Sequence, residues 1–302
     1  MDKKNNKFRN FLDINQLTSD EIKLILKESK KIKKDYYDDV NNNALSGKQV
    51  ALIFEKPSTR TRVSFEVGVN QLGGNSVVLT SSDSQLGRGE PIMDTAKVLT
   101  RYVDMIMIRT FKHETLKDMA EFANIPVING LTDFSHPCQV LTDILTIEEK
   151  LGTIEGKTIS WFGDCNNMAN SWMHAAEMLN FNLRLCCPEE LAPSTVRSDN
   201  ISVVSNTEKA ARGADVITTD TWVSMGDTDG EYKNNILKSY KVTKELFDLA
   251  NDDAIFLHCL PAHRGEEVEE SVIDGSSSVI YDEAENRLHV QKSIMLWCLK
   301  EI

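Results

Sequence analysis

The chain has 302 residues, of which 41% are hydrophobic, and it carries a formal net charge of -12. This length is enough for one large domain or two of ordinary size, and we favour two. The acidic balance argues against a general nucleic-acid surface, because binding to a phosphate backbone needs a broad basic field. Any anionic ligand would therefore have to be bound by a local cluster of arginines.

The N-terminal segment MDKKNNKFRN is polar, and the apolar core of a secretory signal does not follow it. A run of about 18 apolar residues, which a membrane-spanning helix needs, occurs nowhere in the sequence. The six cysteines lack the paired spacing of a zinc site and the density of a disulfide scaffold. We therefore expect a soluble, cytoplasmic protein without membrane contact, in which most cysteines are buried thiols.

The first half of the chain alternates between two periods. The runs KQVALIFE, SVVLT, DMIMIRT and IPVING are short and rich in β-formers, whereas the segments between them carry apolar residues at helical spacing, such as Phe65, Val69 and Leu72. The polar run DDVNNNALSG predicts a loop. Repeated strand–helix–strand units predict a parallel sheet.

The segment HPCQVLTDILTIEEKLG is the predicted connector, because its apolar positions recur at helical intervals without a flexible linker. The same alternation then restarts at GKTISWFGD and continues through FNLRLCCP, ISVVS, ADVITTDTW and AIFLHCLP. We therefore predict an α/β protein of two domains, each a parallel sheet flanked by helices. The first domain is expected to span residues 1–148, with a C-terminal helix at 286–302 packed back on it, and the second residues 149–285.

The stretch FEKPSTRTRVSFEVG has the chemical character of a phosphate site. Pro57 ends the strand and Ser58 is a suitable N-cap, so backbone N–H groups, hydroxyls and Arg60 would converge at the positive end of a helix. The stretch lacks the glycines and the lysine of a Walker loop, so it does not imply a nucleotide. Taken alone, it is more typical of a capped helix with solvated arginines.

Two further groups follow neighbouring strands and favour the ligand interpretation. Arg109 ends the apolar run DMIMIRT, and the segment HPCQ, from His136 to Gln139, begins the helix after the next strand. Ligands of open α/β sheets bind outside the carboxyl ends of the strands, so these groups and Arg60 are expected to reach one point. A lone His136 would also suit a helix cap or a core position.

The second half offers groups of another kind. The segment GDCNNMANS lacks the spaced glycines of a dinucleotide fingerprint, which argues against NAD binding. Asn167, Asp220 and Ser224 suit the head group of an amino acid, because they offer acceptors to an ammonium and a donor to a carboxylate. Each of them alone is an ordinary loop or cap residue.

The motifs STRTR, HPCQ and HCLP, in this order and carried by two α/β halves, resemble the transcarbamoylase family, and DTWVSMG is similar to its ornithine-specific branch. The similarity extends from FLDINQLTSDEI to LHVQKSIMLWCL, which is nearly the whole chain. Several long motifs in a fixed order are far more specific than any one of them.

The resemblance implies transfer of a carbamoyl group from carbamoyl phosphate to the side-chain amine of L-ornithine, giving L-citrulline and phosphate in arginine biosynthesis. The residues that it assigns to carbamoyl phosphate are Ser58, Thr59, Arg60, Thr61, Gln85, Arg109, His136, Gln139, Cys259, Leu260 and Arg287. Those that it assigns to ornithine are Asn167, Asp220, Ser224 and Met225. Those expected to act in catalysis are Arg60, Arg109, His136 and Cys259.

Carbamoyl phosphate already carries a good leaving group, so the protein mainly has to position the amine, polarise the carbonyl and stabilise charge on the phosphate. We expect no metal, no other cofactor and no covalent intermediate on Cys259. An alkylammonium titrates near ~10.4, so the site must also favour the neutral amine.

The resemblance further implies a homotrimer, or a higher assembly of trimers. In the family, the loop that corresponds to SSDSQLGRGEP reaches the carbamoyl phosphate site of the neighbouring subunit, and Gln85 matches the contact residue. The composition of this loop alone predicts only an exposed connection.

Two alternatives stay open. One is a transcarbamoylase for another acceptor, such as aspartate, putrescine or an acetylated ornithine; Asp220 and the SMG motif favour a free amino acid with a cationic side chain. The other is a non-catalytic relative that binds carbamoyl phosphate or a partner. The sequence leaves open whether the reaction serves arginine synthesis or breakdown.

Overall fold

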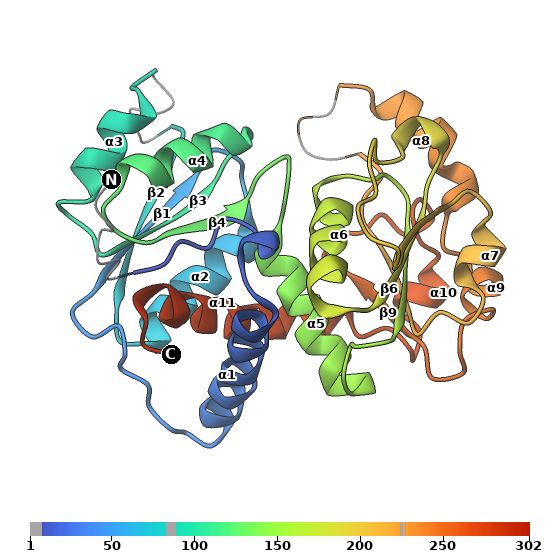
Figure 1. Ribbon diagram of the computed structural model, residues 1–302, viewed down its shortest axis with the longest axis horizontal. Coiled ribbons are helices and arrows are strands. Elements are labelled where there is room, and N and C mark those ends of the chain that lie inside the picture. Colours follow the sequence, from blue (N-terminus) through green and yellow to red (C-terminus); the bar gives the residue numbers. More distant parts are fainter. Residues whose placement is uncertain (1–7, 83–88, 224–225, 227) are drawn as a thin grey trace. The chain divides into compact units, whose positions relative to one another are not determined.

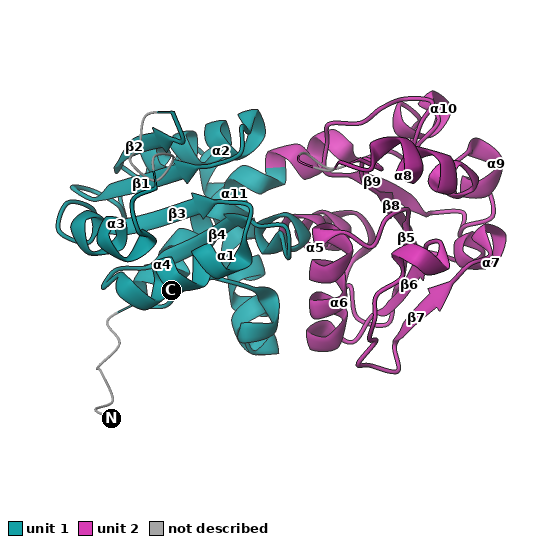
Figure 2. Ribbon diagram, turned by 90° about the horizontal axis from the view of Figure 1, so that it is seen from above, with its two compact units in different colours: residues 1–141, 286–302 teal, residues 142–285 magenta. Residues whose placement is uncertain are grey.

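The computed structural model describes residues 8–82, 89–223, 226 and 228–302, and within them the chain forms two parallel β-sheets (Figure 1). Residues up to Leu141 together with Asn286–Ile302 form unit 1, and Thr142–Glu285 form unit 2 (Figure 2). The chain passes from unit 1 to unit 2 within α5 (Pro137–Leu151) and returns within α11 (Ile280–Leu299). The predicted fold class, two α/β domains with parallel sheets flanked by helices, is confirmed.

Unit 1 contains a sheet with the strand order β2-β1-β3-β4, in which all pairs are parallel. Its strands are β1 (Gln49–Phe54), β2 (Asn75–Thr80), β3 (Met105–Arg109) and β4 (Val127–Leu131). Its remaining helices are α1 (Ser19–Tyr37), α2 (Thr59–Gln71), α3 (Ile92–Leu99) and α4 (His113–Phe122), with a short 3-10 helix at Ile14–Gln16.

Helices cover both faces of this sheet. Ile53 of β1 and Ile106 of β3 pack with Leu116 and Met119 of α4 in one core cluster, to which α3 also contributes. Figure 1 shows α3 and α4 on one side of the strands, and α2 and α11 on the other. The strands β1, β3 and β4 are therefore mostly buried between two helical layers, as expected for continuously apolar strands, whereas the edge strand β2 is partly exposed.

Unit 2 contains a sheet with the strand order β7-β6-β5-β8-β9, again with parallel pairs only. Its strands are β5 (Thr158–Phe162), β6 (Asn182–Cys186), β7 (Ile201–Val204), β8 (Val216–Thr219) and β9 (Ile255–His258). Its helices are α6 (Asn167–Leu179), α7 (Thr207–Ala211), α8 (Gly230–Leu237), α9 (Lys244–Phe247) and α10 (Glu270–Ile273), with 3-10 turns at Glu189–Leu191 and Lys238–Tyr240.

One core cluster of unit 2 lies on one face of its sheet. Phe162, Ile217 and Phe256 come from three neighbouring strands and pack with residues of α7, α9 and α10. Figure 1 shows α6 on the side of the strands opposite to α7 and α9. The strand order places β5 and β8 side by side, so the loops after these two strands share one edge of the sheet.

All six cysteines are free, and Cys138, Cys186, Cys187 and Cys298 are buried. The expectation that most cysteines are buried thiols is therefore confirmed. None of the helices in the described part of the chain has the length and the apolar character needed to cross a membrane.

Candidate active site

The polar side chains of unit 1 gather at the carboxyl ends of its strands. Ser58 lies four residues after the last residue of β1, and Arg109 is the last residue of β3. The predicted N-cap is confirmed, because the side chain of Ser58 accepts a hydrogen bond of 3.3 Å from the backbone N–H of Thr61. This cap fixes the first turn of α2 and with it the position of the Thr61 hydroxyl.

Two guanidinium groups converge on that hydroxyl. Arg109 donates to Thr61 Oγ1 over 3.1 Å, and Arg287 of α11 donates to the same atom over 2.7 Å. Arg287 also donates to Gln139 Oε1 over 2.9 Å and lies 3.1 Å from His136 Nε2. Five of the residues predicted to bind carbamoyl phosphate are thus joined in one cluster, although Arg287 is 226 residues from Thr61.

His136 is uncharged in this cluster. Burial of the ring lowers the pKa of His136 well below its ordinary value, and the positive charges of Arg287 and Arg109 lower that pKa further. Because a guanidinium can only donate, Nε2 accepts from Arg287, and the neutral ring therefore carries its hydrogen on Nδ1. The cluster is a region of positive potential with a neutral imidazole in it.

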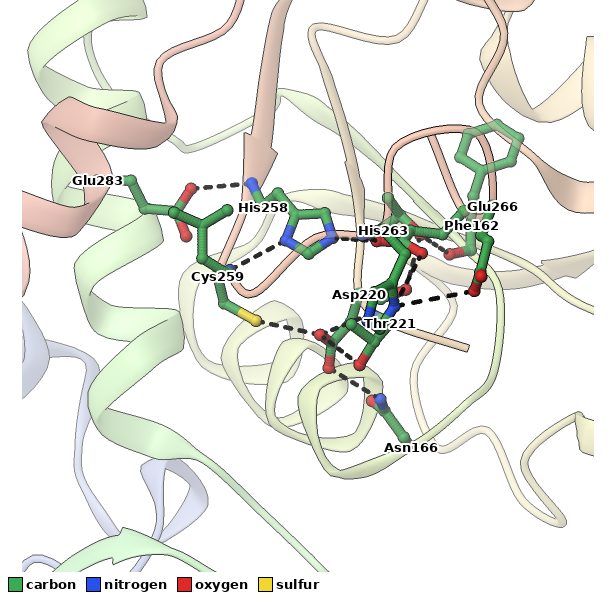
Figure 3. A network of polar contacts seen from close by, with 12 residues as sticks. Phe162, Asn166, Asp220, Thr221, His258, Cys259, His263, Glu266 and Glu283 are labelled. Atoms are coloured by element: carbon green, nitrogen blue, oxygen red, sulfur yellow. Dashed lines mark hydrogen bonds and ion pairs between the residues drawn. The ribbon is translucent and has the colours of Figure 1, made fainter. Parts of the chain in front are cut away.

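In unit 2, the side chains at the strand ends centre on Asp220, which directly follows β8 (Figure 3). Its Oδ1 accepts a hydrogen bond of 3.3 Å from the Cys259 thiol and one of 2.8 Å from the backbone N–H of Thr221. Its Oδ2 accepts from the side-chain amide of Asn166 over 3.1 Å. The carboxylate is thus held in place from three sides and remains an acceptor.

The Cys259 side chain is a thiol, not a thiolate. Burial raises the pKa of Cys259 well above its ordinary value, and the negative charges of Asp220, Glu283 and Asp143 raise it further. A thiolate is the nucleophilic form of cysteine, so these surroundings disfavour a covalent role. They instead make Cys259 a hydrogen-bond donor to Asp220.

The backbone around Cys259 is held by His258, which ends β9 and is buried. The backbone N–H of His258 donates to Glu283 Oε2, and its ring Nδ1 accepts from the backbone N–H of Leu260, both over 2.9 Å. Nε2 of the same ring lies 3.3 Å from Oε1 of the buried Glu267. Leu260 has a φ of 56°, which is uncommon for a residue with a side chain and typical of constrained functional segments.

The sequence matches two models of one enzyme family. The aspartate/ornithine carbamoyltransferase carbamoyl-P binding domain matches residues 9–149, and the Asp/Orn binding domain of the same family matches residues 155–298. The chain belongs to the aspartate/ornithine carbamoyltransferase family. The resemblance that the motifs predict is therefore confirmed.

Similar proteins agree over nearly the full length. The ornithine carbamoyltransferase of Rhodopseudomonas palustris (strain BisA53) is 55% identical over 302 residues, covering 96% of this chain and 97% of the relative. The one from Nitrobacter winogradskyi is also 55% identical, with the same coverage. Among solved structures, ornithine carbamoyltransferase from Pyrococcus furiosus has a TM-score of 0.93 at 44% identity, covering 97% of this chain and 98% of that one. The enzyme from Burkholderia thailandensis has a TM-score of 0.90 at 44% identity, covering 96% and 98%.

Other residues that the family motifs single out lie outside the cluster around Thr61 or outside the described residues. Thr59 and Arg60 are exposed on the first turn of α2. Cys259 and Leu260, which the motifs assign to carbamoyl phosphate, belong to unit 2. Gln85, Ser224 and Met225 lie outside the described residues.

The structure adds residues that the sequence analysis did not select. Asn166, not its neighbour Asn167, is the N-cap of α6 and donates to Asp220. His258 and Glu283 orient the segment that carries Cys259. His258 was within the quoted motif HCLP and Asn166 within GDCNNMANS, so both had a local signal, whereas Glu283 had none.

Proposed function

We propose that this protein is an ornithine carbamoyltransferase, which transfers the carbamoyl group of carbamoyl phosphate to the side-chain amine of L-ornithine. The observation that carries the proposal is the contrast between two clusters: arginines around Thr61 in unit 1, and carboxylates around Cys259 in unit 2. The first suits an anion and the second suits an ammonium group. The family and the curated relatives support the same reaction.

Carbamoyl phosphate is assigned to unit 1. The N-terminus of α2, with Ser58, Thr59 and Arg60, would bind the phosphate, because free N–H groups and a positive helix end favour an anion. Arg109, Thr61 and His136 would face the carbonyl oxygen. Arg287 and Gln139 would hold these groups in position, since Arg287 already joins Thr61, His136 and Gln139.

Ornithine is assigned to unit 2. Asp220 would accept hydrogen bonds from the α-ammonium group, while Asn167, Ser224 and Met225 would bind the rest of the amino acid. Asn166 would act through Asp220, because it donates to the carboxylate oxygen opposite Cys259. Cys259 would lie beside the reacting amine as a neutral thiol and orient it.

In the reaction, the neutral side-chain amine of ornithine attacks the carbonyl carbon of carbamoyl phosphate. A C–N bond forms, the C–O bond to phosphate breaks, and the phosphate leaves with the electron pair. The attacking nitrogen releases a proton, for which the departing phosphate is a suitable acceptor. Guanidinium groups around the leaving phosphate stabilise the charge that develops on it, which is the main contribution expected from the protein.

Activity of the purified protein tests this proposal. Carbamoyl phosphate should be consumed with ornithine to form citrulline and phosphate in equal amounts, whereas aspartate, putrescine and acetylornithine should support little turnover. Preference for one of those acceptors would identify a different transcarbamoylase, and no turnover with any of them would favour a non-catalytic relative. Comparison of the rates of citrulline synthesis and citrulline phosphorolysis would then distinguish arginine biosynthesis from arginine breakdown. We propose that the protein serves biosynthesis. We also propose that it acts in the cytoplasm, where free cysteines are typical.

We also propose a homotrimer in which Gln85 completes the carbamoyl phosphate site of a neighbouring chain. Light scattering should give three chains per particle. Mixed Gln85→Ala and Arg109→Ala proteins, each nearly inactive, should regain ~one quarter of wild-type activity after reversible dissociation, because one site in four pairs an intact Arg109 with an intact neighbouring Gln85 in a closed ring. Confirmed reassociation without activity would show that Gln85 does not act across chains.

A further inference from the structure

The turn that follows Cys259 and Leu260 brings three ligand-type side chains together. His263 Nδ1, Glu266 Oε2 and a carboxylate oxygen of Glu267 all lie within 4.8 Å of one another. The Nδ1 atom is 3.8 Å from Glu266 Oε2 and 3.8 Å from Glu267 Oε2, and Figure 3 draws His263 with Glu266. These separations are too long for hydrogen bonds, and they are ion pairs only when His263 is protonated.

Glu267 is the unusual member, because its side chain is completely buried. Its Oε1 accepts from the backbone N–H of His263 over 2.5 Å and lies 3.3 Å from His258 Nε2. Its Oε2, which faces His263 Nδ1, has no hydrogen-bond partner among the described residues. A buried carboxylate oxygen without a partner is costly, and a cation is the ligand that would satisfy it.

The turn is already held in this shape. The backbone N–H of Glu266 donates to His263 O over 2.9 Å, and that of Gly265 donates to Val268 O over 2.8 Å. Arg264 points its guanidinium at Asp274, with two hydrogen bonds of 2.7 Å. The ligand-type atoms are therefore presented together by a fixed backbone, and little ordering is needed on binding.

We propose that His263, Glu266 and Glu267 bind a divalent transition-metal ion such as Zn²⁺. One imidazole and two carboxylates form a nitrogen- and oxygen-donor set of the kind that Zn²⁺ uses, and the imidazole disfavours Mg²⁺ and Ca²⁺. Ligand atoms at 2.0–2.2 Å from a tetrahedral ion lie ~3.4 Å apart, which is about 0.4 Å less than the two distances of 3.8 Å from His263 Nδ1 to the carboxylates. The side chains of His263 and Glu266 are 54% and 53% exposed, which leaves room for water in the remaining positions.

The ion would also stabilise the segment that carries Cys259. Glu267 would be its ligand through Oε2 while Oε1 stays beside His258, and His258 in turn holds the backbone of Leu260. The imidazole of His258 would then be a neighbour of the metal ligand and would help to orient it. The proposal does not depend on the assignment of the substrates.

A second group of potential ligands lies nearby and must be distinguished in any test. Asp220, His258 and Cys259 also present ligand-type atoms within 4.8 Å of one another. That group contains a thiol, whereas the proposed site contains only nitrogen and oxygen donors. Co²⁺ separates the two, because a thiolate ligand adds an intense near-ultraviolet charge-transfer band that imidazole and carboxylate ligands lack.

The experiment is a Co²⁺ and Zn²⁺ titration of the metal-free full-length protein, followed by absorption spectroscopy and calorimetry. The variants are His263→Ala and Glu266→Gln, both in an exposed turn, with Glu270→Gln as the control for the change of charge on an exposed glutamate close by. Circular dichroism checks that each variant is folded. Cys259→Ser removes the thiol of the other group.

We expect one Co²⁺ per chain, bound without the thiolate band, retained in Cys259→Ser and Glu270→Gln, and weakened at least ~10-fold in His263→Ala and in Glu266→Gln. Zn²⁺ should displace the Co²⁺, whereas excess Mg²⁺ should not. Unchanged affinity in both turn variants would overturn the proposal. Binding that disappears in Cys259→Ser and shows the thiolate band would overturn it as well, because it would place the ion at the other group.

Discussion

The cluster around Thr61 in unit 1 and the cluster around Cys259 in unit 2 have a similar arrangement but opposite charge. In unit 1, Arg109 and Arg287 surround the Thr61 hydroxyl and His136, and in unit 2, Asp220 and Glu283 surround Cys259. Both clusters follow the carboxyl ends of parallel strands, which is where open α/β sheets bind their ligands. Under the proposed assignment, this difference would allow one repeated architecture to bind an anion in one unit and an ammonium group in the other.

The contrast extends to protonation. The arginines help to lower the pKa of His136, and the carboxylates help to raise the pKa of Cys259, so each titratable group is driven to its neutral form. Neutral groups of this kind suit hydrogen bonding to substrates. They do not suit nucleophilic attack by the thiol or a permanent positive charge on the imidazole.

The largest effect is expected when a guanidinium group is removed from unit 1, which tests the role of positive charge there. Arg109→Ala and Arg60→Ala should each lower kcat by ~10²–10³-fold, because the contacts that we propose for them, with the carbonyl and the phosphate, would act mainly as charge develops. Steady-state kinetics at saturating substrates measures the loss. Arg62→Ala is the matched control, since Arg62 is on the same helix and pairs with Glu66 over 2.9 Å. A variant that keeps more than about a tenth of wild-type turnover would show that its arginine lacks this role.

The unit 2 side is tested by Asp220→Asn. Loss of a charged acceptor should raise the KM for ornithine by ~10–100-fold while the KM for carbamoyl phosphate changes little. Asp252→Asn provides the control, because Asp252 is exposed and the change of charge is the same. If both KM values rise together, Asp220 has a structural role and the assignment of an ammonium to unit 2 is wrong.

A smaller but more specific effect is expected in the pH dependence of alkylation at Cys259. Because its folded pKa is raised, alkylation by iodoacetamide should be slow at neutral pH and should accelerate only well above pH ~8.5, the value for a free thiol. Mass spectrometry of the peptide that contains Cys259 follows the reaction. Asp220→Asn should move the profile to lower pH, because Asp220 contributes to the shift. A profile centred at or below the free-thiol value would contradict the acidic environment.

The smallest expected effect concerns His136. Its folded pKa is lowered, so NMR of labelled histidine should show a ring that stays neutral below pH ~6.5, the ordinary value for a histidine. In the unfolded chain His136 does bind a proton, so its contribution to stability falls as the pH drops below that value. Arg287→Ala should raise the pKa of His136, since Arg287 is the larger of the two charge effects. A ring that titrates normally in the wild type would contradict the cationic cluster.

The metal proposal also follows from the acidic character of unit 2. Its buried Glu267 lies next to His258, with Oε1 3.3 Å from the ring Nε2. The short segment AHRGEEV contains all the proposed ligand residues, but their spacing matches no common metal-binding motif. Only the turn at Gly265, which has a φ of 89°, brings the carboxylates back toward His263.

The local sequence determined the elements and the chemical type of each cluster. Apolar runs of four to eight residues marked the strands, helical spacing marked the segments between them, and Ser58 after a proline marked the start of α2. These signals depend on neighbours along the chain, so they can be recognised in the sequence without knowledge of the fold. Two other features are not local properties of the sequence. One is the order of the strands in each sheet. The other is contact between residues far apart in the chain, such as Arg287 and Gln139, which are hydrogen-bonded although 148 residues separate them.

Tertiary structure decided which side chain of each motif meets which partner. Asn166 and Asn167 are adjacent and chemically identical, yet Asn166 caps α6 and donates to Asp220 because successive residues at a helix start point in different directions. Glu283 reaches the backbone of His258 only because α11 begins close to the end of β9. The sequence by itself determined which chemical groups the protein has and in which elements they lie. The distances between these groups, their burial and their pKa shifts depend on neighbours in space. The packing of elements far apart in the chain therefore decided them.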